Sequence, residues 1–231
     1  MSYTLNSIEE VIEDLKAGKP VIIVDDESRE NEGDLVLAAE FATRESINFI
    51  IKEARGLLCT PMLEGDLLRL GIPQMVEKNT DNHETAFTVS VDHVDTTTGI
   101  SPEERAVTMQ KLIDPNAKPE DFRRPGHVFP LRYKEGGVLV RQGHTEASID
   151  LCKLAGLYPA AAICEITNDE GYMSRMDDLL AFSKKHNLKI ASVEALVEYR
   201  KRHDRLVSIA AETKLPTKFG DFRIIVFKNE V

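Results

Sequence analysis

Residues 21–34 read Val21-Ile22-Ile23-Val24-Asp25-Asp26-Glu27-Ser28-Arg29-Glu30-Asn31-Glu32-Gly33-Asp34. The first four are apolar and β-branched, which predicts a buried strand, and the acidic residues after them predict a loop at its end. Ligand sites form in such loops when helices cover the sheet. Six carboxylates in ten residues repel one another unless a cation or a shared proton lies among them. Their hard oxygen atoms suit Mg²⁺ or Mn²⁺, although a solvated acidic turn is the alternative interpretation.

Outward from this stretch, helical and extended patterns alternate along the chain. Helices are predicted at about residues 7–18, 44–55, 64–70, 101–113, 145–154, 175–186 and 192–203. Strands are predicted at about residues 21–24, 35–38, 57–60, 86–91, 137–140, 161–167 and 189–191. Residues 114–130 hold four prolines and are predicted to be irregular. Because several strands follow one another without a crossover helix, we expect a mixed sheet with helices on both faces.

Composition narrows the class of protein. The chain has 231 residues, 42% of them hydrophobic and 29% charged, as in an ordinary globular protein. Its formal charge of -10 argues against a nucleic-acid or membrane-surface binder, because those use basic surfaces. Residues 1–6 lack the basic and apolar parts of a signal peptide. The three cysteines have no metal-type spacing and are expected to be buried thiols, which fits a cytoplasmic protein.

A second candidate site reads Arg141-Gln142-Gly143-His144-Thr145-Glu146. It lies between the strand expected at 137–140 and the helix expected at 145–154. Thr145 can cap that helix, whose free N–H groups and positive dipole end favour a phosphate, and Arg141 can bind the same phosphate. His144 is then a candidate metal ligand. The alternative is an ordinary glycine turn with a capping threonine.

Three further features could carry chemistry. His127 lies in a proline-glycine loop beside two arginines, where a histidine is usually just exposed to solvent. Glu165 interrupts an apolar strand, so it lies either on the wet face of that strand or near a ligand. The hydroxyl-rich loop 96–101 could help to hold an anion or merely cap the helix after it.

Four strings along the chain can be compared with known families. They are Asp25–Asp34, Thr98-Gly99-Ile100-Ser101 with Glu104-Arg105-Ala106, Arg124-Pro125-Gly126-His127-Val128-Phe129-Pro130-Leu131, and Arg141–Glu146. Together they resemble 3,4-dihydroxy-2-butanone 4-phosphate synthase, a riboflavin-pathway enzyme that acts on ribulose 5-phosphate. The resemblance covers about residues 5–205. It implies an α+β fold, a three-layer α-β-α sandwich with a mixed twisted sheet, and a homodimer with active sites near the subunit interface.

The resemblance also implies a reaction and its residues. The reaction is the Mg²⁺- or Mn²⁺-dependent conversion of D-ribulose 5-phosphate to L-3,4-dihydroxy-2-butanone 4-phosphate and formate, by a carbon–carbon lyase with two metal ions per active site. Glu30 and His144 match metal-binding positions, and His127 and Glu165 match catalytic positions. The positions that match substrate contacts are Arg29, Glu30, Asp34, Arg141, Gln142, Gly143, His144, Thr145 and Glu165. The rivals are another Mg²⁺-dependent sugar-phosphate enzyme, such as a phosphohydrolase, and a metal- or phosphate-binding regulatory module.

The tail departs from a synthase that stands alone. Residues 1–205 are expected to be the synthase domain, and 206–231 a linker with the truncated start of a GTP cyclohydrolase II-like domain. The segment Leu215–Phe222 with the strand expected at Arg223–Phe227 resembles the opening of that second enzyme. A lone strand has no partners for its backbone groups. We therefore expect the tail to be poorly ordered, or packed against the synthase domain or a neighbouring molecule.

Overall fold

The computed structural model describes residues 4–229, so the outer ends of the two expected domains, residues 1–3 and 230–231, lie outside the described residues. The α-helices are α1 (Ile8–Lys16), α2 (Arg44–Glu53), α3 (Glu64–Arg69), α4 (Pro102–Leu112), α5 (His144–Leu154), α6 (Met176–His186) and α7 (Val193–His203). The strands are β1 (Val21–Val24), β2 (Gly33–Ala38), β3 (Cys59–Met62), β4 (Val91–His93), β5 (Phe122–Arg132), β6 (Ala161–Glu165), β7 (Ile190–Ser192), β8 (Val207–Thr217) and β9 (Gly220–Asn229). Three 3₁₀ turns are η1 (Ala39–Phe41), η2 (Pro119–Asp121) and η3 (Gly137–Leu139).

Seven strands form one sheet, in the order β4-β5-β3-β6-β2-β1-β7. The pairs β1–β7 and β3–β5 are parallel, and the other four pairs are antiparallel. The prediction of a mixed sheet is therefore confirmed. The antiparallel pairing of β1 with β2 places the acidic loop between them at one end of the sheet, next to the end of β6.

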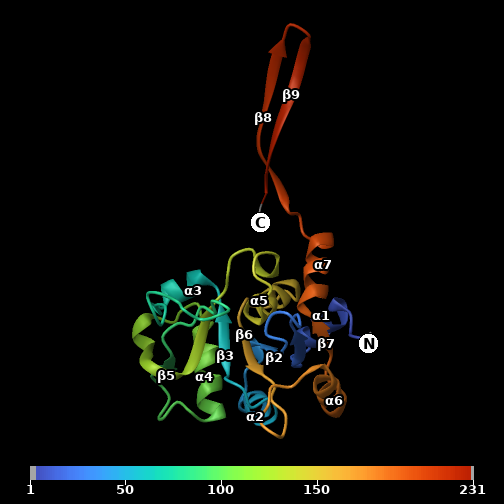
Figure 1. Ribbon diagram of the computed structural model, residues 1–231. Coiled ribbons are helices and arrows are strands. Elements are labelled where there is room, and N and C mark those ends of the chain that lie inside the picture. The colour runs from blue at the N-terminus through green and yellow to red at the C-terminus, as the bar shows by residue number, and fades with distance from the viewer. Residues whose placement is uncertain (1–3, 230–231) are drawn as a thin grey trace.

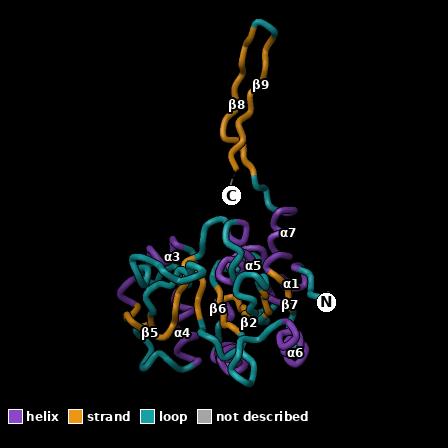
Figure 2. The backbone as a smooth tube through the Cα atoms, in the orientation of Figure 1, coloured by secondary structure: helices purple, strands orange, loops and turns teal. Residues whose placement is uncertain are grey.

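Helices cover both faces of this sheet, as Figures 1 and 2 show. Alternate residues of one strand point to opposite faces, so Ile22 and Val24 join one core cluster while Val21 and Ile23 join the other. The first cluster is completed by α2, α3, α4 and α6, and the second by α1, α5 and α7. Each fully buried isoleucine or leucine contributes about 1.5–3 kcal/mol. The expected three-layer α-β-α sandwich follows from this two-sided burial.

Local sequence signals explain where the first helices begin. The hydroxyl of Ser7 accepts the N–H of Glu10 at 3.3 Å, and the Glu10 carboxylate accepts the N–H of Ser7 at 3.0 Å. At the start of α4 the hydroxyl of Ser101 accepts the N–H of Glu104 at 3.2 Å, and Pro102 is the first residue of the helix. Both starts were predicted. All three cysteines are free and buried, also as expected. Among residues 4–229, no helix combines the length and the apolar character that a membrane crossing requires.

Three predicted elements are wrong. Residues 122–132 form strand β5, whereas an irregular segment was expected at 114–130. Proline has no N–H to donate, but its carbonyl can still accept hydrogen bonds within a sheet. The carbonyl of Pro130 accepts both the N–H and the hydroxyl of Thr88. Residues 137–140 form the turn η3 rather than a strand, because Gly136 and Gly137 have φ of 92° and 63° and curl the backbone. The strand expected at 86–91 begins only at Val91.

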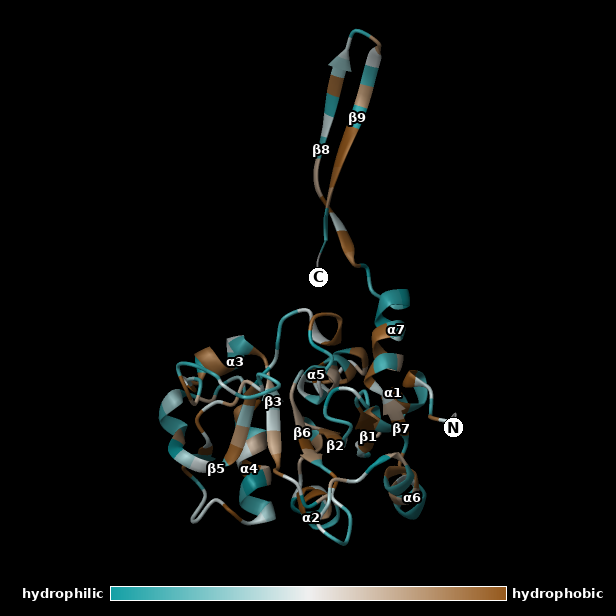
Figure 3. Ribbon diagram, viewed as in Figure 1, coloured by the Kyte–Doolittle hydropathy of each residue, from teal (hydrophilic) through white to brown (hydrophobic). Residues whose placement is uncertain are grey.

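The tail also differs from its prediction. β8 and β9 pair with each other along their whole length, from Val207 opposite Asn229 to Thr217 opposite Gly220. The strand expected at Arg223–Phe227 therefore has a partner within the tail and is not alone. Figures 1 and 3 show this hairpin projecting beyond α7, away from the sandwich, with hydrophobic and hydrophilic residues mixed along it.

Candidate active site

The acidic loop between β1 and β2 is folded around the carboxylate of Asp25. That carboxylate accepts the backbone N–H of Glu30 at 3.1 Å and of Glu32 at 2.9 Å. It also accepts a hydrogen bond from Nη1 of Arg29 at 2.9 Å, and its side chain has no exposed surface. Arg29 in turn contacts the Glu30 carboxylate at 2.8 Å. The loop is therefore a fixed structure rather than a solvated turn, and it holds Glu30 at the end of the sheet.

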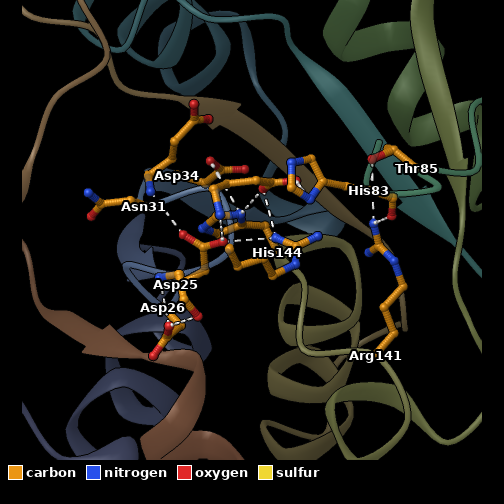
Figure 4. Close-up of polar contacts among 12 residues, drawn as sticks. Asp25, Asp26, Asn31, Asp34, His83, Thr85, Arg141 and His144 are labelled. Atoms are coloured by element: carbon orange, nitrogen blue, oxygen red, sulfur yellow. Dashed lines mark hydrogen bonds and ion pairs between the residues drawn. The ribbon is translucent and has the colours of Figure 1, made fainter. Parts of the chain in front are cut away.

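His144 meets this loop from the first turn of α5. Its Nδ1 lies 3.4 Å from Oε2 of Glu30 and 3.9 Å from Oδ1 of Asp34. One ligand atom each from Asp25, Glu30 and His144 lies within 4.8 Å of the others. Figure 4 shows Asp25 and His144 in the same cluster of polar side chains. Nε2 of His144 and Oδ1 of Asp34 are buried without a hydrogen-bond partner. Orphaned buried polar atoms are costly. A divalent cation fits this donor set, since carboxylate oxygens suit Mg²⁺ or Mn²⁺ and neutral imidazole is a common metal ligand.

The protonation of these groups is shifted by their mutual contact. Burial opposes the charge on His144, but Asp34 and the hydrogen bond to Glu30 outweigh it and raise the pKa of His144 to about 9. Burial also opposes the charge on Glu30, but His144 and Arg29 outweigh it and lower the pKa of Glu30 to about 2. Burial raises the pKa of Asp34 to about 7. The cluster thus combines a charged pair with a carboxyl group that can hold a proton near neutral pH.

Glu165 joins the cluster through the sheet. Its Cα lies opposite that of Asp34 in the β2–β6 pairing, so the two side chains share a face. Oε2 of Glu165 accepts the N–H of Leu57 at 2.8 Å. A Cβ on Gly56 would lie 2.5 Å from that same oxygen, so glycine is required there. Glu165 was expected either on the wet face of its strand or near a ligand. It lies at the end of β6 and also beside the candidate site, so the two alternatives do not exclude each other.

Arg141 lies on the opposite side of the candidate site from the acidic loop. Its Nη1 contacts the buried carboxylate of Glu146 at 2.6 Å. Its Nη2 donates to the carbonyl of His83 at 2.9 Å and to the hydroxyl of Thr85 at 3.4 Å, as Figure 4 shows. Nδ1 of His83 lies 4.0 Å from Oε1 of Glu30. No local sequence pattern singled out His83 and Thr85, because they lie in a polar loop far from both motifs. Glu146 was quoted as part of a motif but without a role.

Two cavities meet at this place. The first, about 130 Å³, lies between the acidic loop, the start of α5 and the end of the sheet. Its walls are formed by Arg29, Glu30, Glu32, Asp34, Cys59, Thr85, Phe87, Leu131, Arg141, His144, Thr145, Ile163 and Glu165. The second, about 470 Å³, shares Arg141 and Thr145 with it. The first cavity brings together most of the residues expected at the site.

The expected role of Thr145 as helix cap is wrong. The N-cap of α5 is Gly143, and Thr145 lies inside the first turn with its side chain at the cavity. A Cβ on Gly143 would lie 2.3 Å from Nη1 of Arg141 and 3.0 Å from Nη2 of Arg29. Glycine therefore lets two guanidinium groups approach the start of the helix. The free N–H groups there complete a place suited to an anion.

Three expected residues are not among the described residues that form the walls of this cavity: Gly143, which is the N-cap of α5, Gln142 and His127. Gln142 is exposed, and His127 lies on β5. His127 instead contacts Asp92: the backbone N–H of His127 donates to Oδ1 at 2.8 Å, and its Nδ1 lies 2.8 Å from Oδ2. One copy of the chain therefore does not bring His127 to the cluster around Glu30.

Comparison with known proteins places the chain in a family. A family model described as 3,4-dihydroxy-2-butanone 4-phosphate synthase matches residues 9–199. The riboflavin biosynthesis protein RibBA of Bacillus cereus is 55% identical over 224 residues, which are 97% of this chain and 56% of that protein. RibBA of Endomicrobium trichonymphae is 55% identical over 96% of this chain and 56% of its own length. The chain spans little more than half the length of these relatives.

Solved structures of the same family are also similar to this chain. RibBX of A. baumannii, described as a two-domain 3,4-dihydroxy-2-butanone 4-phosphate synthase, is 43% identical with a TM-score of 0.87, over 97% of this chain and 66% of that one. A 3,4-dihydroxy-2-butanone 4-phosphate synthase in complex with two magnesium ions is also 43% identical, with a TM-score of 0.82, over 87% of this chain and 99% of that one.

Proposed function

Because the chain belongs to the 3,4-dihydroxy-2-butanone 4-phosphate synthase family, we propose that it converts D-ribulose 5-phosphate to L-3,4-dihydroxy-2-butanone 4-phosphate and formate. The observation that carries this proposal is the group of Asp25, Glu30 and His144 beside a cavity that two arginines flank. The substrate is a phosphorylated hydroxyketone, which needs both a charge-stabilising end and a phosphate-binding end. The two sides of the cavity supply them.

Glu30 and His144 hold the metal, which is Mg²⁺ or Mn²⁺ with two ions per site. The solved relative with two magnesium ions supports this assignment. A bound divalent cation would stabilise negative charge on adjacent substrate oxygens as a proton leaves the carbon beside the carbonyl. Asp25 keeps Glu30 in position through its contacts with the backbone of the loop. The orphaned atoms Nε2 of His144 and Oδ1 of Asp34 are consistent with such a ligand.

Arg141, Gly143 and Thr145 hold the phosphate end. Arg141 offers a guanidinium group, and the start of α5 offers free backbone N–H groups and the positive end of the helix dipole. Binding at this end fixes which carbon atoms of the sugar reach Glu30 and His144. Arg29 and Asp34 contact the sugar oxygens, and Gln142 is assigned to the substrate by resemblance alone.

Glu165 and His127 move protons. Proton transfer by such groups contributes a factor of about 10²–10⁴ each. Glu165 lies in the wall of the cavity, on the same face of the sheet as Asp34. The raised pKa of Asp34, about 7 because of burial, also suits a group that gives or takes a proton near neutral pH.

The reaction is tested by identifying its products. The full-length chain with Mg²⁺ and ribulose 5-phosphate should release formate while the phosphorus stays esterified, which enzymatic formate detection and ³¹P NMR together measure. Release of inorganic phosphate without formate would favour a phosphohydrolase. Binding of ribulose 5-phosphate with neither product would favour a regulatory module.

The family resemblance and the position of His127 support a homodimer in which a second copy supplies its His127 to the site. Complementation tests this arrangement. Glu30→Gln and His127→Ala, each inactive alone, should regain about a quarter of the wild-type rate when mixed and allowed to exchange, because half of the dimers then carry one intact site. No recovery in mixtures shown to contain mixed dimers would place His127 and Glu30 of one chain in the same site.

The boundary between a synthase domain and the tail lies near residue 205. The family match ends at residue 199, α7 ends at His203 and the hairpin begins at Val207. A chain that ends at Asp204 should therefore retain nearly all turnover, and a large loss would assign the hairpin to the synthase. The resemblance of the tail to GTP cyclohydrolase II has no counterpart in the family match and stays a prediction.

A further inference from the structure

We propose that Asp92 is a positioning residue that fixes His127 in one tautomer, with its proton on Nδ1 and a free electron pair on Nε2 for proton transfer. This inference rests on the proposed role of His127 in the reaction. It adds a residue, Asp92, that neither the motifs nor the cavity identified. The contact between these two side chains carries the argument.

Both carboxylate oxygens of Asp92 bind the same residue. Oδ1 accepts the backbone N–H of His127, and Oδ2 lies 2.8 Å from Nδ1 of its ring. An ionised carboxylate can only accept hydrogen bonds, so Nδ1 must carry the proton. The Asp92 side chain is 10% exposed and the His127 side chain is 44% exposed. The carboxylate is therefore fixed, while the ring stays open to a reacting molecule.

Two glycines allow this close approach. A Cβ on Gly126 would lie 2.3 Å from the backbone nitrogen of Asp92, so only glycine lets the chain before His127 come so near to β4. A Cβ on Gly99 would lie 2.1 Å from Oδ2 of Asp92, and Gly99 also has φ of 82°. Asp92 is thus enclosed from two sides, by Gly99 in the loop between β4 and α4 and by Gly126 in β5.

The neighbouring histidine provides an internal contrast. Nδ1 of His93 accepts the backbone N–H of Asp95 at 3.2 Å, while Oδ2 of Asp95 lies farther away at 3.4 Å, so the hydrogen bond places the ring proton on Nε2. His93 in β4 and His127 in β5 are therefore held in opposite tautomers. The nearest partner of Nδ1 is a carboxylate oxygen at 2.8 Å in His127 and a backbone N–H donor at 3.2 Å in His93.

The fixed tautomer matters for the direction of proton transfer. Nε2 of His127 takes a proton from the substrate into its electron pair and forms an imidazolium with protons on both nitrogens. Asp92 stays ionised and stabilises this positive charge, and Nε2 later returns the proton. In Asp92→Asn the amide has one acceptor and one donor group, so it cannot accept from both the backbone N–H and Nδ1. The contact that holds the ring proton on Nδ1 is then lost, so Nε2 is no longer kept unprotonated.

Two-bond ¹H–¹⁵N NMR of the full chain without substrate reads the tautomer directly, with the His127 signal assigned by its loss in His127→Gln. Wild type should show His127 protonated on Nδ1 and His93 on Nε2. Asp92→Asn should lose the fixed His127 tautomer and lower kcat by about 10²-fold or more, with KM within about threefold. Asp95→Asn, the matched control, should change neither.

Gly99→Ala tests the same contact without altering the carboxylate. The added Cβ should displace Asp92 and shift the His127 tautomer while His93 stays unchanged. A wild-type His127 protonated on Nε2 would overturn the proposal, as would normal kcat in folded Asp92→Asn. If wild type has the expected tautomer but releases no formate, the proposed reaction fails and the Asp92 contact stands. If formate is released with the opposite tautomer, only the role of Asp92 fails.

Discussion

The sandwich of residues 5–203 and the hairpin of β8 and β9 are ordered by different interactions. Each central strand of the sandwich is buried on both faces, with Ile22, Leu35 and Ala162 fully covered. The hairpin is ordered by the backbone pairing of its two strands, and Phe219 and Phe227 are 81% and 61% exposed. Isolated two-stranded hairpins are marginal in water. The difference shows that pairing alone gives a regular element, whereas a precise site needs burial on both sides.

The hairpin is nevertheless patterned. The paired residues Leu215 and Phe222 lie on one face with Ile224 and Val226, whereas Arg223 lies on the other. Arg223 forms an exposed ion pair with Glu212 at 2.7 Å. Such pairs contribute little to stability. The same residue types that form an ordered cluster at the acidic loop are thus nearly without consequence in the hairpin.

The largest difference between the two regions should appear in the protection of their backbone amides from hydrogen exchange. Amides of β2 and β6 open only with the whole domain, so their protection should exceed that of β8 and β9 by about 10⁴-fold or more. Exchange mass spectrometry or NMR of the full chain measures this ratio. Equal protection in both regions would show that something covers the hairpin in solution and would break the comparison.

The same substitution in each region should have very different effects on turnover. Glu30→Gln removes a charged ligand and should lower kcat by about 10³-fold, because metal stabilisation of developing charge amounts to several kcal/mol. Glu212→Gln in the hairpin is the matched control and should stay within about twofold. Circular dichroism should find both variants folded. Comparable losses in the two variants would contradict this account.

Arginine substitutions should sharpen the comparison on substrate affinity. Arg141→Lys loses the forked contact with a phosphate and with Glu146, so KM should rise about 10- to 100-fold with a smaller change in kcat. Arg223→Lys in the hairpin should leave both constants unchanged. Steady-state kinetics with ribulose 5-phosphate measures both. A fall in kcat at constant KM would assign Arg141 to the chemical step instead.

The smallest effect concerns the edge of the sandwich. The pKa of Glu10 is lowered to about 2 by hydrogen bonds from Lys189, from the backbone of Ser7 and from Asn6. A lowered pKa stabilises the fold above the ordinary value of 4.5, and this contribution disappears as the pH falls toward 2. Glu10→Gln should therefore lower Tm by about 1–3 °C near pH 7. The gap to wild type should close in acid, and a gap independent of pH would refute this origin.

How far the sequence could predict this structure depends on the range of the interactions. The β1 strand, the capped helices and the residues of both motifs carry local signals, and the mixed sheet follows from their order. Strand β5 carries no such local signal, because its prolines resemble those of a loop. Only its pairing with β3 and its contact with Thr88 make it a strand. The hairpin was missed because Pro216 and the register shift near Ile209 disguise the alternation in β8.

The same distinction holds for the site. Glu30 and His144 lie in long motifs and were predicted, and the structure brings them within 3.4 Å. The contacts of Arg141 with His83 and Thr85 join segments more than fifty residues apart, so no local pattern could reveal them. The bidentate contact of Asp92 with His127 is equally long-range and depends on glycines whose role is visible only in three dimensions.

The central claim is that the acidic loop and His144 form a metal-dependent site for ribulose 5-phosphate. The most direct test is the rate of formate release by exhaustively chelated protein as Mg²⁺ is added back. We predict no formate without the metal, a rise to full rate as Mg²⁺ saturates the site, and no such rise in Glu30→Gln. Full formate release by the chelated protein would contradict the account.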